Sequence, residues 1–159
     1  MNEKRPDVSE FGSVDPAPAS DDAVVGSLRS TLCNEEERMF QRMRALFSLR
    51  NIGGKDAVDA LADAFSSSSA LLKHEIAYVL GQMQDDHAVP HLIERLEDIE
   101  EDVMVRHEAA EALGAIGNKV AFSTLNKFVD DKQIVIAESC EVAIDLLNWV
   151  SSGKLDYSD

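Results

Sequence analysis

Two histidine–glutamate pairs are the residues of this sequence whose types and spacing could do chemistry. His74 and Glu75 lie in the segment LKHE (72–75), and His107 and Glu108 lie in VRHE (105–108), 33 residues further on. If each segment has the same place in a repeated helical unit, the side chains of stacked units can lean toward one point, because packed helices lie about 8 to 10 Å apart. Two imidazoles and a carboxylate match the ligand set of a non-haem Fe(II) oxygenase, which leaves positions open for oxygen and substrate.

The helical position of His107 points away from the apolar face of its unit, about 200° from Val105 at 100° per residue. That apolar stripe is formed by Val105, Ala109, Ala112, Leu113 and Ile116. Small residues follow both histidines at offsets of three and seven, namely Ala77 and Gly81, and Ala110 and Gly114. We expect these strips to leave space for a ligand or for another helix. A solvated His-Glu pair, copied with the repeat, is the alternative that the residues alone leave open.

An internal repeat predicts the elements that position the two pairs. Four segments (44–53, 75–84, 108–117 and 141–150) align on a leucine in the same phase, at Leu49, Leu80, Leu113 and Leu146. The separations are 31, 33 and 33 residues, and an amphipathic stretch precedes each segment, at 22–32, 56–65, 89–96 and 120–129. The unit is therefore a helix pair. Four such pairs predict an all-α solenoid of HEAT-like repeats of the short PBS-lyase type, in which each pair buries its apolar face against its neighbours.

The composition of the two ends gives the expected domain boundaries. Residues 1–20 hold three of the four prolines and few apolar side chains, so we predict a disordered tail or an inter-lobe linker there. We expect the repeat domain over 21–150 and a flexible C-terminal tail over 151–159. Within the domain, Gly53, Gly54 and Gly117 are placed to end helices, and Pro90 is placed in the first turn of one.

Other potential sites are weaker. His87 and His91 stand four residues apart, but Pro90 lies between them in an expected helix start, which favours surface or capping histidines over metal ligands. The acidic run EDIEED (97–102) is typical of a solvated loop and helix start. The sequence contains no Ser-His-Asp or Cys-His nucleophile pattern and no phosphate-binding glycine loop, which argues against hydrolases and kinases.

Charge and hydropathy limit the partners. Thirty acidic residues against fifteen basic ones give a formal charge of -15, which disfavours nucleic acid and anionic lipid. The same charge favours a cationic partner, or serves solubility alone. No apolar run approaches the roughly 18 residues of a membrane span, and Cys33 and Cys140 match no metal or redox spacing. We expect a cytoplasmic protein with reduced thiols, no nucleic-acid partner and no membrane.

At SALLKHEIAYVLGQMQ (69–84) and MVRHEAAEALGAIG (104–117) the sequence resembles the deoxyhypusine hydroxylase family. The resemblance extends over essentially the whole chain. SVDPAPA (13–19) is similar to the linker between the two halves of that family, and ESCEVAIDLL (138–147) and LDY (155–157) are similar to its C-terminal end.

The resemblance implies a two-lobed HEAT-repeat enzyme that hydroxylates the deoxyhypusine side chain of a basic translation factor. It implies O2 as co-substrate and two Fe(2+) ions per complete two-lobed site. Carried over to this chain, His74, Glu75 and His107 are expected iron ligands, and Glu108 is expected either to be a ligand or to bind the cationic substrate. No catalytic residue beyond the metal ligands is expected.

The chain holds two of the four His-Glu motifs that the family implies, so it resembles the C-terminal lobe alone. The expected partner is then a missing N-terminal lobe or a second copy of this chain. The alternative function is a metal-free HEAT-repeat scaffold that binds a basic protein. A pigment-handling chaperone similar to phycobilin lyases is a third hypothesis.

Overall fold

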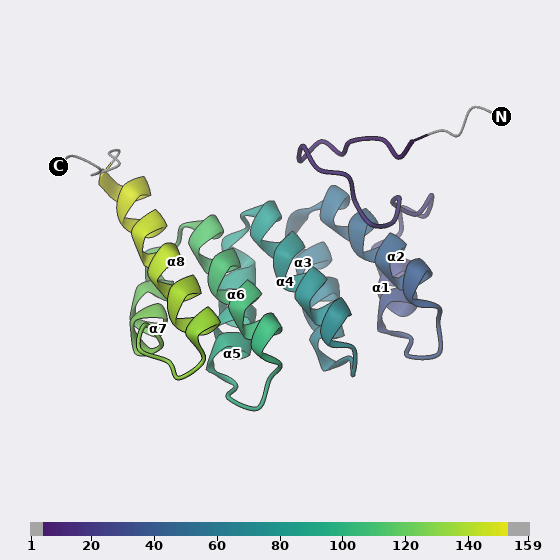
Figure 1. Cartoon of the computed structure of the whole chain (residues 1–159). Coiled ribbons are helices and arrows are strands. Elements are labelled where there is room, and N and C mark those ends of the chain that lie inside the picture. The colour runs from purple at the N-terminus through teal and green to yellow at the C-terminus, as the bar shows by residue number, and fades with distance from the viewer. Residues whose placement is uncertain (1–4, 153–159) are drawn as a thin grey trace.

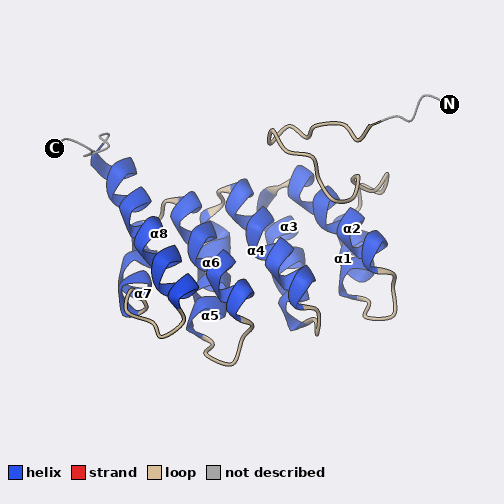
Figure 2. Ribbon diagram, in the orientation of Figure 1, coloured by secondary structure: helices blue, strands red, loops and turns tan. Residues whose placement is uncertain are grey.

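The computed structural model of the chain describes residues 5–152. Over this range it is built from α-helices joined by short loops and 3₁₀ turns, and contains no strand (Figure 1, Figure 2). The helices are α1 (Val25–Cys33), α2 (Met39–Ile52), α3 (Gly54–Asp63), α4 (Ala70–Met83), α5 (Val89–Glu97), α6 (Val103–Ile116), α7 (Phe122–Lys127) and α8 (Ile134–Ser152). These eight helices confirm the predicted all-α solenoid of four pairs.

The pairs stack into two layers. Helices α2, α4, α6 and α8 run side by side in one layer, and each packs on its preceding partner, α1, α3, α5 or α7, in the other (Figure 1). We call these the inner layer and the outer layer. The core between them is aliphatic, and Leu49, Leu80 and Leu113, which the repeat placed in phase, have no exposed surface. Leu146, in the last unit, is half-buried.

The inner-layer helices approach closely at the strips of small residues. A Cβ atom on Gly81 would lie 3.0 Å from the Cα of Ala112, and one on Gly114 would lie 2.9 Å from the Cα of Ala143. Ala77 and Ala110 have no exposed surface. Of the two occupants expected at these strips, a ligand or another helix, the structure shows the helix, because the next helix of the inner layer packs against them.

Special backbone positions fall largely where the sequence predicts them. Gly53 ends α2 and Gly117 ends α6, both with positive φ, and Gly117 is in the left-handed conformation. Gly54, which was also expected to end a helix, is instead the first residue of α3. Pro90 lies in the first turn of α5, where its missing N–H costs little. Gln84 ends α4 in the left-handed conformation, with φ of 51°, although no glycine marks this position.

The segment that precedes α1 has no helix but packs on α2. Ala17 is 1% exposed, Asp15 forms an ion pair with Arg50 at 2.6 Å, and the Arg44 guanidinium donates hydrogen bonds to the carbonyls of Pro18 and Ala19. The predicted boundaries at 20 and 150 stay predictions; the first helix begins at Val25 and the last ends at Ser152. Residues 1–4 and 153–159, which include the LDY segment and most of the expected C-terminal tail, lie outside the described residues.

Across residues 5–152, no helix has both the length and the apolar character needed to cross a membrane. Cys33 and Cys140 are free thiols, as expected.

Candidate metal centre

Helices α4 and α6 bring His74 and His107 to the same surface. The two helices are neighbours in the inner layer, and each histidine occupies the fifth position of its helix. The ring centroids lie 6.4 Å apart, with 27° between the ring planes. Side-chain exposure is 31% for His74 and 16% for His107, so neither ring is in the core. The repeat therefore aims both imidazoles at one region, as the 33-residue spacing predicts.

Glu108 supplies a carboxylate between the two rings. Its Oε2 atom lies 3.1 Å from Nε2 of His74 and 3.5 Å from Nε2 of His107. One donor atom from each of the three residues lies within 4.8 Å of the others. Two neutral imidazoles and one carboxylate are the donors that Fe(II) and related transition ions bind. The donor set thus fits a metal ion, and we call these three residues the inner site.

Ser139, from α8, controls which nitrogen of His107 faces this site. The Ser139 hydroxyl donates to the carbonyl of Val135 at 2.6 Å, so its one proton is already used. The contact of 2.7 Å between Ser139 Oγ and His107 Nδ1 therefore has the imidazole as donor. A neutral His107 then carries its proton on Nδ1 and presents the lone pair of Nε2 toward Glu108. This tautomer leaves Nε2 free to bind a metal ion.

Glu75, the fourth predicted site residue, lies at the edge of this arrangement. Its Oε1 atom is 4.0 Å from Nδ1 of His74, and it is not part of the three-residue donor group. Burial raises the pKa of the Glu75 carboxyl, while His74 opposes the shift and Asp15 adds to it. The geometry thus gives Glu108, rather than Glu75, the place between the imidazoles.

Burial also raises the pKa of Glu108. His74 and His107 oppose that shift, and the neighbouring carboxylates of Glu111 and Glu75 add to it. Glu108 thus lies beside two further acidic groups in a partly buried region, and their repulsion disfavours its ionised form. A cation bound among them would relieve this repulsion, whether a metal ion or the amine of a substrate.

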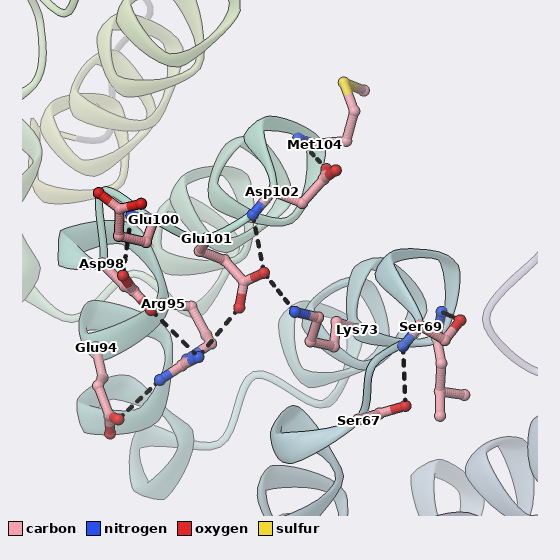
Figure 3. Close-up of polar contacts among 11 residues, drawn as sticks. Ser67, Ser69, Lys73, Glu94, Arg95, Asp98, Glu100, Glu101, Asp102 and Met104 are labelled. Atoms are coloured by element: carbon pink, nitrogen blue, oxygen red, sulfur yellow. Dashed lines mark hydrogen bonds and ion pairs between the residues drawn. The ribbon is translucent and has the colours of Figure 1, made fainter. Parts of the chain in front are cut away.

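The residues that precede the two histidines tie the repeats together. Lys73 donates to Glu101 at 2.5 Å, and Arg95 donates to the other oxygen of Glu101 at 3.1 Å (Figure 3). Glu101 lies in the loop that leads into α6, so this contact links α4 to the start of the helix that carries His107. In the next unit, Arg106 forms an ion pair at 3.4 Å with Asp131, in the loop that leads into α8.

Glu101 corrects one expectation from the sequence. The acidic run 97–102 was expected to be solvated, but the side chain of Glu101 is 3% exposed. Burial opposes ionisation, yet hydrogen bonds from Lys73, from the Asp102 amide and from Arg95 outweigh it, so that the pKa of Glu101 is lowered. The run is solvated only in part because two cations face this one carboxylate.

An open cavity of about 390 Å³ lies beside the inner site. Glu108 and Glu111 line it, together with two aromatic rings, Phe11 of the N-terminal segment and Tyr78 of α4. The remaining lining residues are Gly81, Gln82, Gln84, Ala112 and Ala115. Acidic groups beside aromatic rings are suited to a cationic side chain.

The comparisons with known proteins agree with this architecture. The family model for HEAT repeats matches residues 25–104 and 65–144, which together span most of the chain. The chain belongs to the HEAT-repeat family. Within that family it is 48% identical to deoxyhypusine hydroxylase of Xenopus laevis over 99% of this chain, and 45% identical to that of Homo sapiens over 97%. A solved structure of human deoxyhypusine hydroxylase in complex with glycerol superimposes with a TM-score of 0.87 and 46% identity, covering 91% of this chain.

The chain spans about half the length of the relatives that it matches. It covers 52% of the Xenopus laevis protein, 51% of the human protein and 50% of the human chain in the solved structure. The resemblance seen in the sequence is therefore confirmed, and it applies to one half of those HEAT-repeat proteins.

The flanking HEAT repeats place apolar side chains where the middle two place histidine. The equivalent residues are Met43 in α2, which is 6% exposed, and Cys140 in α8, which has no exposed surface. Burial raises the pKa of the Cys140 thiol to about 11, so it stays protonated at neutral pH and is a poor metal ligand. The inner site belongs to the second and third repeats.

Sequence reasoning missed three residues that support the inner site. Ser139 orients His107, Glu101 joins the two repeats, and Glu111 lines the adjacent cavity and lies 3.6 Å from Nδ1 of His107. Glu111 follows His107 by one helical turn, which the helical wheel could have revealed. Ser139 and Glu101 contact residues 32 and 28 positions away, and no local pattern marks them.

Proposed function

We propose that this chain is the C-terminal lobe of a non-haem di-iron deoxyhypusine monooxygenase, which hydroxylates the deoxyhypusine side chain of a translation factor to form hypusine. The observation that carries the proposal is the convergence of His74 and His107 on Glu108, in a chain nearly half identical to proteins named deoxyhypusine hydroxylase. The proposal rests on this chain's own donor atoms as well as on the likeness.

The residues that would hold iron are His74, His107 and Glu108, with Glu75 as a further carboxylate ligand. Iron, when bound, would supply the redox chemistry for inserting one oxygen atom of O2 into a C–H bond, which no side chain can do; the other oxygen atom would leave as water, with two electrons from an external reductant and two protons. The protein's part is to present unprotonated Nε2 atoms and carboxylate oxygens at one place. Ser139 does this for His107 by accepting the proton of Nδ1 in a hydrogen bond.

The substrate side chain is a long amine, and the cavity beside the inner site suits it. Glu108 and Glu111 line this cavity with acidic groups, and the rings of Phe11 and Tyr78 line it with apolar surface for the methylene groups. The formal charge of -15 would draw a basic protein toward the chain over longer distances.

A complete site with two irons needs more ligands than this half provides. The chain spans about half of its relatives, so the missing N-terminal lobe is the proposed source of the other His-Glu pairs. A second copy of this chain is the other possible source. In either case iron would bind the assembled form and would promote assembly by mass action.

The test is iron-dependent hydroxylation of deoxyhypusine, measured by mass spectrometry as the gain of one oxygen atom. The chain would be assayed alone and together with an N-terminal lobe, with iron content and assembly size determined in parallel. We expect His74→Ala and His107→Ala each to lower activity at least about 100-fold, because a ligand of the donor set is lost. His87→Gln/His91→Gln, a matched double change outside the inner site, should leave activity unchanged.

Wild-type protein that holds no iron, both alone and with the second lobe, would contradict the proposal. A metal-free scaffold for a basic protein would then be the better interpretation.

A further inference from the structure

The two histidines outside the inner site meet a carboxylate on the outer layer. Nε2 of His87 lies 2.6 Å from Oδ1 of Asp59, and Nε2 of His91 lies 3.9 Å from the same oxygen. One donor atom from each of the three residues lies within 4.8 Å of the others. The sequence favours surface histidines here because Pro90 interrupts the pair; the structure adds Asp59, which lies 28 residues before His87.

Backbone structure holds these side chains in place. His87 lies in the 3₁₀ turn η2 (Asp86–Ala88), and the side chain of Asp85 accepts a hydrogen bond from its amide at 2.9 Å. The turn leads directly into α5, so His87 and His91 stand one helical turn apart on a continuous stretch of chain. Pro90 stiffens the first turn of α5 without taking a hydrogen bond from it. Asp59 reaches the pair from the neighbouring helix α3.

We propose that Asp59, His87 and His91 form a second cation site, which binds a divalent transition ion of the zinc class and joins α3 to η2 and α5. Two histidines at i and i+4 with one carboxylate are a common zinc donor set, and water would complete the coordination. Donor atoms around a tetrahedral zinc ion stand roughly 3.3 Å apart, given bonds of about 2.0 Å. The observed separations of 2.6 and 3.9 Å bracket this value, so small rotations of exposed side chains are enough.

We call Asp59, His87 and His91 the outer site. Two cations lie near it, Lys55 and Arg95, and Arg95 is already paired with Glu94 and Glu101. Asp59 is held ionised, because the hydrogen bond from His87 lowers the pKa of its carboxyl. Lys55, one turn earlier in α3, also acts on Asp59 and would oppose a metal ion, but its side chain is exposed and free to turn into solvent. The three donor side chains are 35 to 38% exposed, which gives an ion direct access from water.

The experiment is a calorimetric titration with Zn²⁺ in a His74→Ala/His107→Ala background, which removes the inner site. Because the chain has four histidines, the quadruple variant that also carries His87→Gln/His91→Gln measures the zinc binding that remains without any histidine. We expect the background protein to bind one Zn²⁺ at least tenfold more tightly than the quadruple variant. Asp59→Asn in that background should weaken binding about tenfold, and Zn²⁺ should raise the melting temperature only when the outer histidines are present.

Equal Zn²⁺ affinity in the background and quadruple proteins would overturn the proposal, and so would an unchanged affinity after Asp59→Asn. If the background variant fails to fold, the comparison is made between the unaltered chain and His87→Gln/His91→Gln, where the zinc stoichiometry should fall by one. An unchanged stoichiometry would equally contradict the outer site. Neither result depends on whether the inner site hydroxylates a substrate.

Discussion

The four histidines of this chain form two pairs on opposite layers, and the pairs are built differently. The inner pair takes one ring from each of two stacked helices, α4 and α6, whereas both rings of the outer pair come from one stretch of chain. The inner rings are 16% and 31% exposed, and the outer rings are 35% and 36% exposed. Repeat stacking positions the first pair, and local helical geometry positions the second.

The two pairs also differ in the pKa of the carboxyl group that each pair contacts. Burial raises the pKa of Glu108, whereas the hydrogen bond from His87 lowers the pKa of the exposed Asp59. Burial disfavours the ionised form of Glu108, whereas the exposed Asp59 keeps its contact with water. A bound cation would therefore stabilise the carboxylate of the inner site more than that of Asp59, which already accepts a hydrogen bond from His87 without any metal.

The largest effect is expected from removing the Ser139 hydroxyl, which orients a ring of the inner pair. This change tests whether the inner pair depends on that hydrogen bond. In Ser139→Ala, His107 loses the acceptor for its Nδ1 proton, so both tautomers become populated. We expect affinity for Fe(II) to fall 10- to 100-fold, as is usual when a hydrogen-bond partner of a metal ligand is removed. Anaerobic titration measures the affinity, and ¹⁵N spectra of the metal-free protein report the tautomer of His107.

Ser151→Ala is the matched control for this change. Ser151 lies in the same helix and donates to the carbonyl of Leu147 at 2.9 Å, as Ser139 donates to Val135, but is exposed. It should leave both the iron affinity and the tautomer of His107 unaltered. An unaltered tautomer in Ser139→Ala would show that another contact orients the ring.

The second largest effect is expected at Glu101, whose ion pairs join the two repeats that carry the inner pair. Glu101→Gln leaves Lys73 and Arg95 without their shared anion, and we expect a loss of about 2 kcal/mol in the free energy of unfolding at pH 7. Because the folded state lowers the pKa of Glu101, the wild-type advantage is complete above the unfolded value near 4.5 and disappears as the pH falls through the lower folded value.

Urea unfolding at pH 7 and in steps below pH 4.5 measures this difference. Glu100→Gln, a change in the exposed neighbour, should alter stability little at either pH. A loss in Glu101→Gln that is constant down to the lowest pH would contradict the ionised form of Glu101 as its source.

A smaller effect is expected where α6 meets α8. Gly114→Ala would place a Cβ atom 2.9 Å from the Cα of Ala143. Overpacking of this kind costs about 1 to 3 kcal/mol, and the better helix propensity of alanine returns about 1 kcal/mol. We expect a net loss of about 1 kcal/mol in thermal or urea unfolding. Gly26→Ala in α1, where nothing lies within 4 Å, should be neutral or stabilising.

The smallest effect belongs to the outer pair in the absence of metal. Asp59→Asn breaks an exposed contact with His87, and exposed ion pairs contribute less than about 1 kcal/mol. Urea unfolding in the presence of a chelator should therefore show little change. A loss above about 2 kcal/mol would mean that this contact supports the stacking of α3 on α5, and the contrast between the pairs would no longer hold.

The sequence predicted the helices and the convergence of the inner pair because both depend on one periodicity. Helical spacing and a 33-residue repeat are enough to aim His74 and His107 at one region. The periodicity could not place Ser139 or Asp59, which reach their partners across 32 and 28 residues by way of tertiary packing. Nor did composition reveal that Glu101 is buried, because its burial depends on cations that other helices supply.

Gly81 has a consequence that reaches beyond its own contact with Ala112. Because Gly81 has no side chain, the backbones of α4 and α6 can lie close together, and their separation sets the distance between the two imidazoles. Substitutions at position 81 would therefore change the distance between the metal-binding atoms of α4 and α6, while every metal-binding residue stayed unchanged. Natural selection on the reactivity of such a centre would then act partly on residues that never contact the ion.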